Sequence, residues 1–167
     1  MTKRILVVDC GYFGSKSDFQ YAIVDVNGDY KYVSKYHCIE GQIHSSSLAR
    51  MIEEIFEENK CDEIHIDGLG TGFAIIDCIS KKYHDKVMIS KSCALSNHEA
   101  ICDLIQDLQR RQLFINKDSM ELYSIIEYIG RDGTLYSDQR GLYKIGRGLD
   151  FNVRRKIQLI LGLYICV

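Results

Sequence analysis

One short segment, which passes from an apolar strand through a glycine-rich turn into an apolar helix, constrains the fold of this chain most. It runs from Glu63 to Asp77. Ile64 and Ile66 alternate with polar neighbours, which is the two-residue period of a half-buried strand. The strand ends at Asp67, and the glycines that follow it allow a tight turn into residues with helical apolar spacing. Because functional groups gather at the carboxyl ends of strands in an α/β sheet, Asp67 is a candidate site residue. The alternative is an ordinary joint in which this aspartate caps the helix.

The length and cysteine content set limits on the class of protein. A chain of 167 residues has the size of one compact domain, so we expect a single domain over residues 1–167. No apolar run is long enough to span a bilayer, so we expect no membrane partner. The seven cysteines are scattered without a C-x-x-C pair, which argues against a zinc site or a disulfide framework. Their pattern favours reduced thiols in an intracellular compartment.

Charge is distributed unevenly along the chain. The formal net charge is −2, so overall charge alone does not make this a polyanion-binding protein. The C-terminal part is different, because basic residues surround the single acid Asp150 between residues 140 and 156. These basic residues are Arg140, Lys144, Arg147, Arg154, Arg155 and Lys156.

The hydrophobic pattern predicts a mixed α/β sheet. Residues 4–9 are a continuous apolar run typical of a central buried strand. Strands over 21–26 and 30–39 follow, joined by the hairpin signal Asn27-Gly28. Later we expect helices over 46–59, 73–79, 97–112 and 118–128, strands over 64–67, 86–90, 113–115 and 134–136, a turn over 130–133, and a helix after Asp150. The order predicts three antiparallel strands, then parallel strands, with helices on both faces.

Three acids lie at comparable joints of this predicted fold: Asp9, Asp67 and Asp150. If the strands that end at Asp9 and Asp67 are neighbours, the two side chains emerge together, and Asp150 can reach them from the last helix. Crowded carboxylates repel one another unless cations neutralise them, and Mg²⁺ or Mn²⁺ suits such oxygen ligands. Two ions roughly 4 Å apart would support phosphodiester cleavage. The alternative is three separate capping or surface aspartates.

Four short motifs carry a resemblance to a known family. They are Ile5–Asp9 with Ser17-Asp18 opening the second strand, Ile64–Gly72, Met120–Tyr128, and Leu149-Asp150 before an apolar helix. Together with the order of elements, they resemble the RNase H-like, retroviral-integrase-type nuclease fold. Within that superfamily the chain is most similar to the nuclease domain of the phage and herpesvirus terminase large subunit.

This resemblance implies a metal-dependent endonuclease that cuts concatemeric viral DNA during genome packaging by two-metal-ion hydrolysis. It implies double-stranded DNA, an ATPase motor domain and other packaging proteins as partners, in the host cytoplasm or nucleus. By analogy, Asp9, Asp67 and Asp150 are the catalytic ligands of two Mg²⁺ or Mn²⁺ ions, and Asp18 is a further candidate ligand. The expected contacts to DNA phosphates, which read no sequence, are Lys144, Arg147, Arg154 and Arg155.

The chain departs from the family pattern in two places. The family commonly has a second acid beside the last one, whereas Phe151 and Asn152 follow Asp150 here. No phosphate-loop motif of an ATPase motor is present, so we expect either an excised domain or a stand-alone nuclease.

Other interpretations stay open at this point. One is an ATP-binding module of the actin and sugar-kinase type, in which residues 9–16 lie where a phosphate-binding hairpin could form. Separately, the glycine-rich turn Gly68–Gly72 could cradle a nucleotide phosphate. A Holliday-junction-resolvase-type nuclease would also place an acid before its last helix. A non-catalytic interaction domain would need none of the three acids. His65 points away from Ile64 and Ile66, and we expect a surface or interlayer histidine rather than a ligand.

Overall fold

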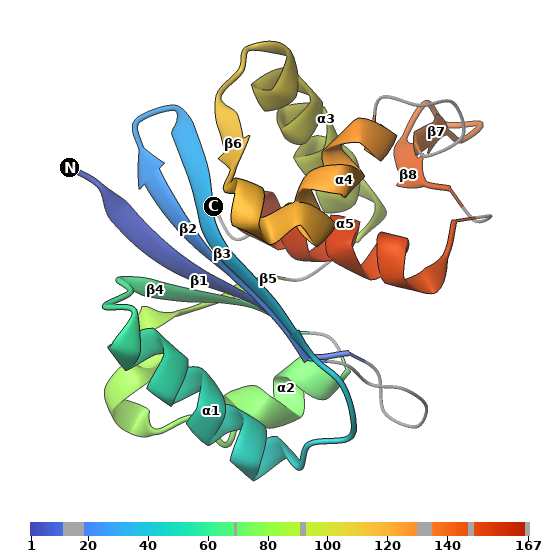
Figure 1. Cartoon of the computed structure of the whole chain (residues 1–167). Coiled ribbons are helices and arrows are strands. Elements are labelled where there is room, and N and C mark those ends of the chain that lie inside the picture. The colour runs from blue at the N-terminus through green and yellow to red at the C-terminus, as the bar shows by residue number, and fades with distance from the viewer. Residues whose placement is uncertain (12–18, 69, 91–92, 130–134, 147–148, 166–167) are drawn as a thin grey trace.

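The computed structural model describes residues 1–11, 19–68, 70–90, 93–129, 135–146 and 149–165. A mixed six-stranded sheet in the order β5-β4-β1-β2-β3-β6 separates two layers of helices (Figure 1). The strands are β1 (Lys3–Asp9), β2 (Phe19–Asn27), β3 (Tyr30–Ile39), β4 (Glu63–Asp67), β5 (Val87–Ser90), β6 (Leu113–Ile115), β7 (Leu135–Ser137) and β8 (Tyr143–Ile145). The helices are α1 (Ser45–Glu58), α2 (Thr71–Ile76), α3 (Ala94–Gln109), α4 (Met120–Ile129) and α5 (Phe151–Ile165), with short 3₁₀ turns η1 (Lys81–Lys86) and η2 (Lys117–Ser119).

The pairing of the strands confirms the predicted fold class. β1, β2 and β3 form an antiparallel meander, and β4 and β5 extend the sheet in parallel from the other side of β1. The short strand β6 adds a parallel edge beside β3, as the expected edge segment over 113–115 predicts. Helices α1 and α2 cover one face, and α3, α4 and α5 cover the other (Figure 1).

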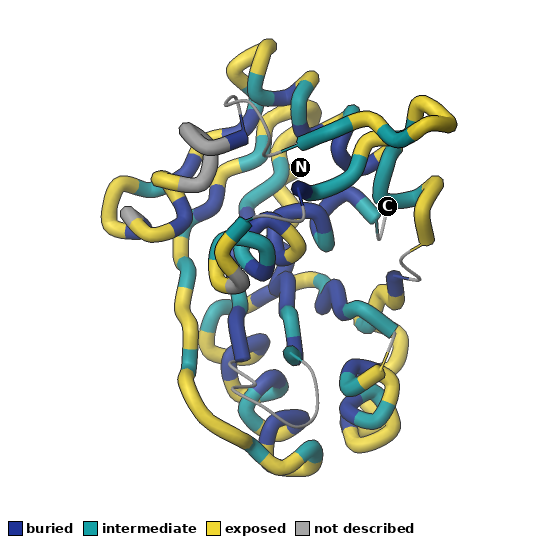
Figure 2. The backbone as a smooth tube through the Cα atoms, turned by 90° about the vertical axis from the view of Figure 1, so that its right-hand side faces the viewer, coloured by how far each residue is buried: buried dark blue, intermediate teal, exposed yellow. Residues whose placement is uncertain are grey.

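β1 lies in the middle of the sheet and is buried on both faces. Ile5 and Val7 belong to the hydrophobic cluster under α3, α4 and α5, whereas Leu6 and Val8 belong to the cluster over α1. Successive side chains of a strand point to opposite faces, so a strand between two helical layers needs apolar residues at every position. This is the physical reason for the continuous apolar run near the N-terminus. Figure 2 shows the buried backbone of the sheet between the two exposed helical surfaces.

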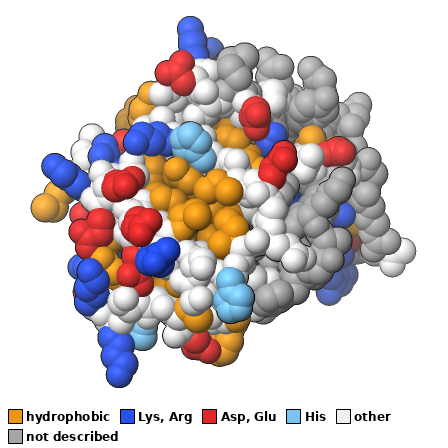
Figure 3. All heavy atoms as spheres, turned by 60° about the horizontal axis from the view of Figure 1, so that its bottom comes forward, with side chains coloured by type: hydrophobic (Ala, Val, Ile, Leu, Met, Phe, Trp, Pro, Cys, Tyr) orange, Lys and Arg blue, Asp and Glu red, His pale blue; other side chains and the backbone are white. Residues whose placement is uncertain are grey.

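The layer formed by α1 and α2 is less regular than the sequence predicts. The apolar face expected after the glycines includes Phe73, but the Phe73 side chain is 63% exposed, while Ile75 and Ile79 are buried. α2 ends at Ile76, after less than two turns, so it does not present one continuous stripe to the sheet. Figure 3 shows the molecule from the side of α1 and α2. Hydrophobic side chains form a group on this surface, beside acidic and basic ones.

The C-terminal part contains the largest difference from the sequence prediction. The predicted strand over 134–136 exists as β7, but it pairs only with β8 in a separate two-stranded hairpin. The sequence did not predict its partner strand, β8. The predicted turn over 130–133 lies outside the described residues.

Two further expectations concern the whole chain. Within the described ranges, no helix has both the length and the apolar character that crossing a membrane requires. Among the same residues the cysteines form no disulfide bond.

We predict that Leu104→Ala lowers the free energy of unfolding by about 2–5 kcal/mol, because Leu104 is only 1% exposed and its loss leaves a cavity under α3. Leu95 is the matched control, since it lies on the same helix and is 55% exposed. We expect Leu95→Ala to change stability by no more than about 0.5 kcal/mol. Urea denaturation of the two variants measures both, and equal losses would contradict this description of the core.

Candidate functional site

Asp9 and Asp67 end two neighbouring parallel strands. In the register between β1 and β4, Val8 lies opposite Ile66, so the next residue of each strand leaves the sheet at the same edge. Both aspartates line a pocket of about 460 Å³. The structure therefore brings together two of the three predicted acids, at the carboxyl ends of strands where ligands are expected.

The Asp9 carboxylate has defined partners on both oxygens. Its Oδ1 accepts a hydrogen bond from the Gly11 backbone N–H at 3.1 Å. Its Oδ2 accepts one from Arg155 Nε at 3.0 Å, and Arg155 Nη2 lies 3.0 Å from the same oxygen. The Asp9 side chain is 24% exposed, while that of Arg155 is only 2% exposed. The pair therefore joins the end of β1 to the first half of α5, and Asp9 is its member that lines the pocket.

This contact corrects the prediction for Arg155. The sequence places Arg155 among the exposed residues that contact DNA phosphates, but the structure buries its side chain and turns the guanidinium to Asp9. Helical periodicity is the reason, because the neighbouring basic residues Arg154 and Lys156 lie on other sides of α5 and stay partly exposed.

Burial and neighbouring charges act on Asp9 in opposite directions. Burial raises the pKa of the Asp9 carboxyl, the charge and hydrogen bond of Arg155 and the Gly11 N–H lower it, and the charge of Asp67 raises it again. Burial also raises the pKa of the adjacent Cys10 thiol well above its usual range, with Asp9 as the next cause. This shift favours the neutral thiol of Cys10 over the thiolate.

The glycines after Asp67 have a packing role. A Cβ atom on Gly72 would lie 1.7 Å from the backbone carbonyl oxygen of Asp67, so α2 begins against the end of β4. A Cβ on Gly68 would lie 2.4 Å from Ile89 Cγ2, and the Gly68 N–H donates to the Ser90 carbonyl at 2.8 Å. At Gly72 the neighbouring atom is backbone, so glycine is required for α2 to begin so close to Asp67, whereas at Gly68 the nearest atom belongs to the Ile89 side chain. A role for this turn in binding phosphate stays a prediction.

Asp150, the third predicted acid, is not among the residues that line the pocket. It is exposed and precedes α5, where its Oδ1 accepts a hydrogen bond from the Asn152 N–H at 2.8 Å. Its carbonyl accepts the Arg154 N–H at 3.0 Å. This is the arrangement of a helix N-cap, which was the alternative interpretation of this residue.

The structure does not show the predicted cluster of three carboxylates. In the part of the chain that it describes, no three His, Cys, Asp or Glu side chains are grouped so as to hold a metal ion. Metal binding by Asp150 thus stays a prediction, because the structure does not place this residue in the pocket with Asp9 and Asp67. Asp18 and Arg147, the other predicted ligand and phosphate contact, lie outside the described residues.

His65 is buried in the sheet, with 3% of its side chain exposed, and it is one of the residues that line the pocket. Its Nε2 lies 3.0 Å from Glu63 Oε2, and burial lowers the pKa of the imidazole. The structure therefore shows an interlayer histidine, one of the two positions that the sequence allows.

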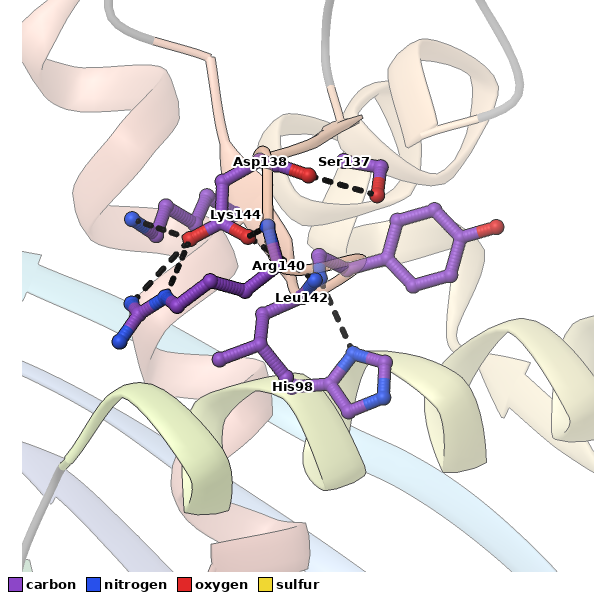
Figure 4. Close-up of polar contacts among 7 residues, drawn as sticks. His98, Ser137, Asp138, Arg140, Leu142 and Lys144 are labelled. Atoms are coloured by element: carbon purple, nitrogen blue, oxygen red, sulfur yellow. Dashed lines mark hydrogen bonds and ion pairs between the residues drawn. The ribbon is translucent and has the colours of Figure 1, made fainter.

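The hairpin of β7 and β8 forms one wall of the pocket, and the sequence did not indicate this role. Tyr136, Tyr143 and Lys144 line the pocket from this side. The hairpin is attached to α3, because the Tyr143 N–H donates to His98 Nδ1 at 3.0 Å and the two rings stack with centroids 5.7 Å apart. Figure 4 shows His98 on α3 below the hairpin.

Asp138 organises the turn of this hairpin. Its Oδ1 accepts the backbone N–H groups of Arg140 at 2.9 Å and Leu142 at 3.1 Å. Its Oδ2 pairs with Lys144 Nζ at 2.8 Å and Arg140 Nη2 at 3.2 Å (Figure 4). The hydrogen bond from Lys144 is the largest cause that holds the pKa of Asp138 far below its usual range. Lys144 and Arg154 line the pocket as basic residues, so their predicted phosphate contacts remain geometrically possible.

Comparison with known proteins supports the fold strongly and the sequence relationship weakly. No family model and no curated protein matches the chain. Among solved structures, the large terminase nuclease of thermophilic phage G20c with bound magnesium matches with a TM-score of 0.68 at 16% identity, covering 98% of this chain and 80% of that one. The large terminase nuclease domain of bacteriophage SPP1 with bound manganese matches with a TM-score of 0.61 at 12% identity, covering 96% and 84%.

A comparison with a longer large terminase shows that the chain matches only one part of that protein. The large terminase of a second thermophilic bacteriophage matches with a TM-score of 0.65 at 12% identity, over 97% of this chain but only 38% of that protein. The chain thus spans less than half the length of that large terminase. The predicted resemblance to terminase nuclease domains is confirmed as a likeness of fold.

We predict that Asp138→Asn increases the hydrogen-exchange rate of the amides in the β7–β8 hairpin, because it removes the carboxylate that Lys144 and Arg140 bind. In the unmodified chain, this stabilisation is fully present above the ordinary pKa of aspartate and is lost as the pH falls through the lower pKa of the folded state. Asp29→Asn, the same change at the exposed turn between β2 and β3, is the control. Unchanged exchange in the Asp138 variant would contradict this role.

Proposed function

We propose that this chain is a metal-dependent DNA endonuclease domain of the terminase type. One observation carries the proposal: two aspartates lie side by side at the carboxyl ends of β1 and β4 and face a pocket. The likeness of fold to large terminase nuclease domains supports this assignment. The activity proposed is hydrolysis of phosphodiester bonds in double-stranded DNA.

Divalent cations are the proposed cofactor. The similar nuclease domains were solved with bound magnesium, manganese and cobalt. In this chain the chemistry of Asp9 and Asp67 fits such an ion, since both are oxygen ligands at the pocket surface. When bound, the ion would activate water and stabilise the charge that develops on phosphate oxygens. The count of two ions, predicted from the sequence, would require further ligands beyond these two carboxylates.

The chain's own residues would hold the DNA backbone. Lys144 and Arg154 line the pocket from β8 and α5, whereas Asp67 lines it from the end of β4. Cationic side chains at this position attract phosphates without reading bases. Gln158 and Asn97 add neutral hydrogen-bonding groups to the same lining.

The biological setting belongs to the same proposal. Large terminases with bound ADP or an ATP analogue are among the similar structures, and this chain covers about two fifths of their length. We place the chain beside an ATPase motor and other packaging proteins, where it would cut concatemeric viral DNA inside the host cell. No observation in the described residues favours the ATP-binding module, the junction resolvase or the non-catalytic domain.

Plasmid cleavage tests the proposed activity. We expect the chain to nick or linearise supercoiled DNA with Mn²⁺ or Mg²⁺ and to be inactive in EDTA. Asp67→Asn should lower the rate by about 100-fold or more, because it removes one of the two carboxylate ligands. Asp77→Asn, an exposed acid after α2 that does not line the pocket, is the matched control and should keep the full rate.

Two results would count against the nuclease. One is the absence of cleavage at every protein concentration together with measurable ATP binding, which would favour the actin-like module. The other is an equal loss of activity in the Asp67 and Asp77 variants, which would place the chemistry elsewhere.

A further inference from the structure

Much of the lining of the pocket has no role in the proposed hydrolysis. Besides Asp9 and Asp67, the pocket is lined from α3, α5 and the β7–β8 hairpin. Ile101 of α3 and Leu161 of α5 contribute buried apolar side chains to this lining. The volume of about 460 Å³ falls within the range of about 300–1,000 Å³ that is usual for sites of small molecules and cofactors. A phosphate group alone needs no apolar lining, so a larger and partly apolar group fits this pocket better.

Two aromatic side chains of the hairpin belong to the lining. They are Tyr136 of β7 and Tyr143 of β8. The Tyr143 ring stacks on the ring of His98, with 16° between the two planes, and the Tyr143 backbone N–H donates to the same histidine. The ring is therefore held in place, while 38% of the residue stays exposed. Aromatic rings that are fixed and accessible in this way are the usual platforms on which unpaired nucleobases stack.

Two side-chain amides of the lining have hydrogen-bonding capacity that the described residues do not use. They belong to Asn97 of α3 and Gln158 of α5. In the part of the chain that the structure describes, neither amide group has a hydrogen-bond partner, so both are open to a ligand. An amide presents a donor and an acceptor side by side, and this pattern matches the edge of a nucleobase.

A base inside a duplex cannot occupy such a pocket, because it is stacked between its neighbours and its edge is already paired. A base reaches the pocket only when it leaves the stack, which costs least where the DNA is mismatched, bulged or single-stranded. The basic residues Lys144 and Arg154 line the same pocket, and they suit the phosphates on either side of an unstacked nucleotide.

We propose that this pocket is a subsite for one unpaired nucleobase of DNA, which stacks on the tyrosines of the hairpin and hydrogen-bonds to Asn97 and Gln158. The inference rests on the proposed nuclease function and adds a substrate preference to it, for DNA with an unpaired nucleotide beside the phosphate to be cleaved. Tyr143, Asn97 and Gln158 are then specificity-determining residues. Asp9 and Asp67 keep the role already proposed for them.

The affinities of the unmodified 167-residue chain for two DNA duplexes test the proposal. One duplex is fully paired, and the other carries a single bulged 2-aminopurine, whose fluorescence falls when the base stacks on an aromatic ring. Fluorescence anisotropy measures both affinities with Ca²⁺ in place of Mg²⁺. We expect the bulged duplex to bind at least about tenfold more tightly, and its 2-aminopurine fluorescence to be quenched in the complex.

Variants of Tyr143 test whether the ring causes this preference. Tyr143→Leu should reduce the advantage of the bulged duplex to less than about threefold, whereas Tyr143→Phe keeps the ring and should retain the advantage. Tyr123→Leu is the matched control, because Tyr123 lies on α4, is 43% exposed and does not line the pocket. If Tyr143→Leu weakens the binding of both duplexes equally, Tyr143 has only a structural role and the proposal is wrong.

A second variant tests the hydrogen bonds to the base. Gln158→Ala should weaken the binding of the bulged duplex by about threefold and leave the paired duplex unchanged, because one hydrogen bond to the unpaired base is lost. Gln109→Ala is its control, since Gln109 is an exposed residue of α3 that does not line the pocket.

Equal affinity of the unmodified chain for the two duplexes would overturn the base subsite and leave the proposed nuclease intact. A preference for the bulged duplex without quenching would also overturn it, since the preference would then come from the flexibility of the DNA. Binding of neither duplex would count against the proposed function and this inference together. If Tyr143→Leu does not fold, the affinities and the fluorescence measured with the unmodified chain still decide the question.

Discussion

The pairing of β1 with strands on both sides is the constraint on which the other features of this structure depend. β1 hydrogen-bonds to β2 in one direction and to β4 in the other, and helices cover both of its faces. A strand in this position has no exposed side except its ends. At its carboxyl end the strand presents the polar side chain of Asp9, and the parallel neighbour β4 presents Asp67 at the same edge.

Both carboxylates are then held by close packing around them. Gly72 allows α2 to begin against the end of β4, and Gly162 allows α5 to lie close to β1. The second approach brings a buried guanidinium to Asp9. The desolvation of an ion pair often offsets its attraction, so a buried pair of this kind is weak evidence of a gain in stability. Because Asp9 of this pair lines the pocket, an electrostatic role at the site is the better explanation.

The comparisons with solved structures fit a fold that is set by apolar positions and close packing rather than by individual side chains. Identities of 12–16% accompany TM-scores of 0.61–0.68 over almost the whole chain. A fold that depends on which positions are apolar, and on where glycine permits close contact, tolerates changes of most individual side chains. Similarity to known proteins therefore supports the arrangement of the helices and strands more strongly than it supports the choice of site residues.

The sequence alone determined the fold class, the order of the main elements and the position of two candidate site residues at strand ends, because these follow from local patterns. The apolar run before Asp9 and the alternation before Asp67 are each contained in one strand. The tertiary structure decided what those patterns do not contain. It showed that Asp150 caps α5, that Arg155 is buried against Asp9, and that the β7–β8 hairpin lies over α3 through His98. Each of these depends on how a helix or hairpin is placed against a distant strand or helix, and local periodicity carries no information about that placement.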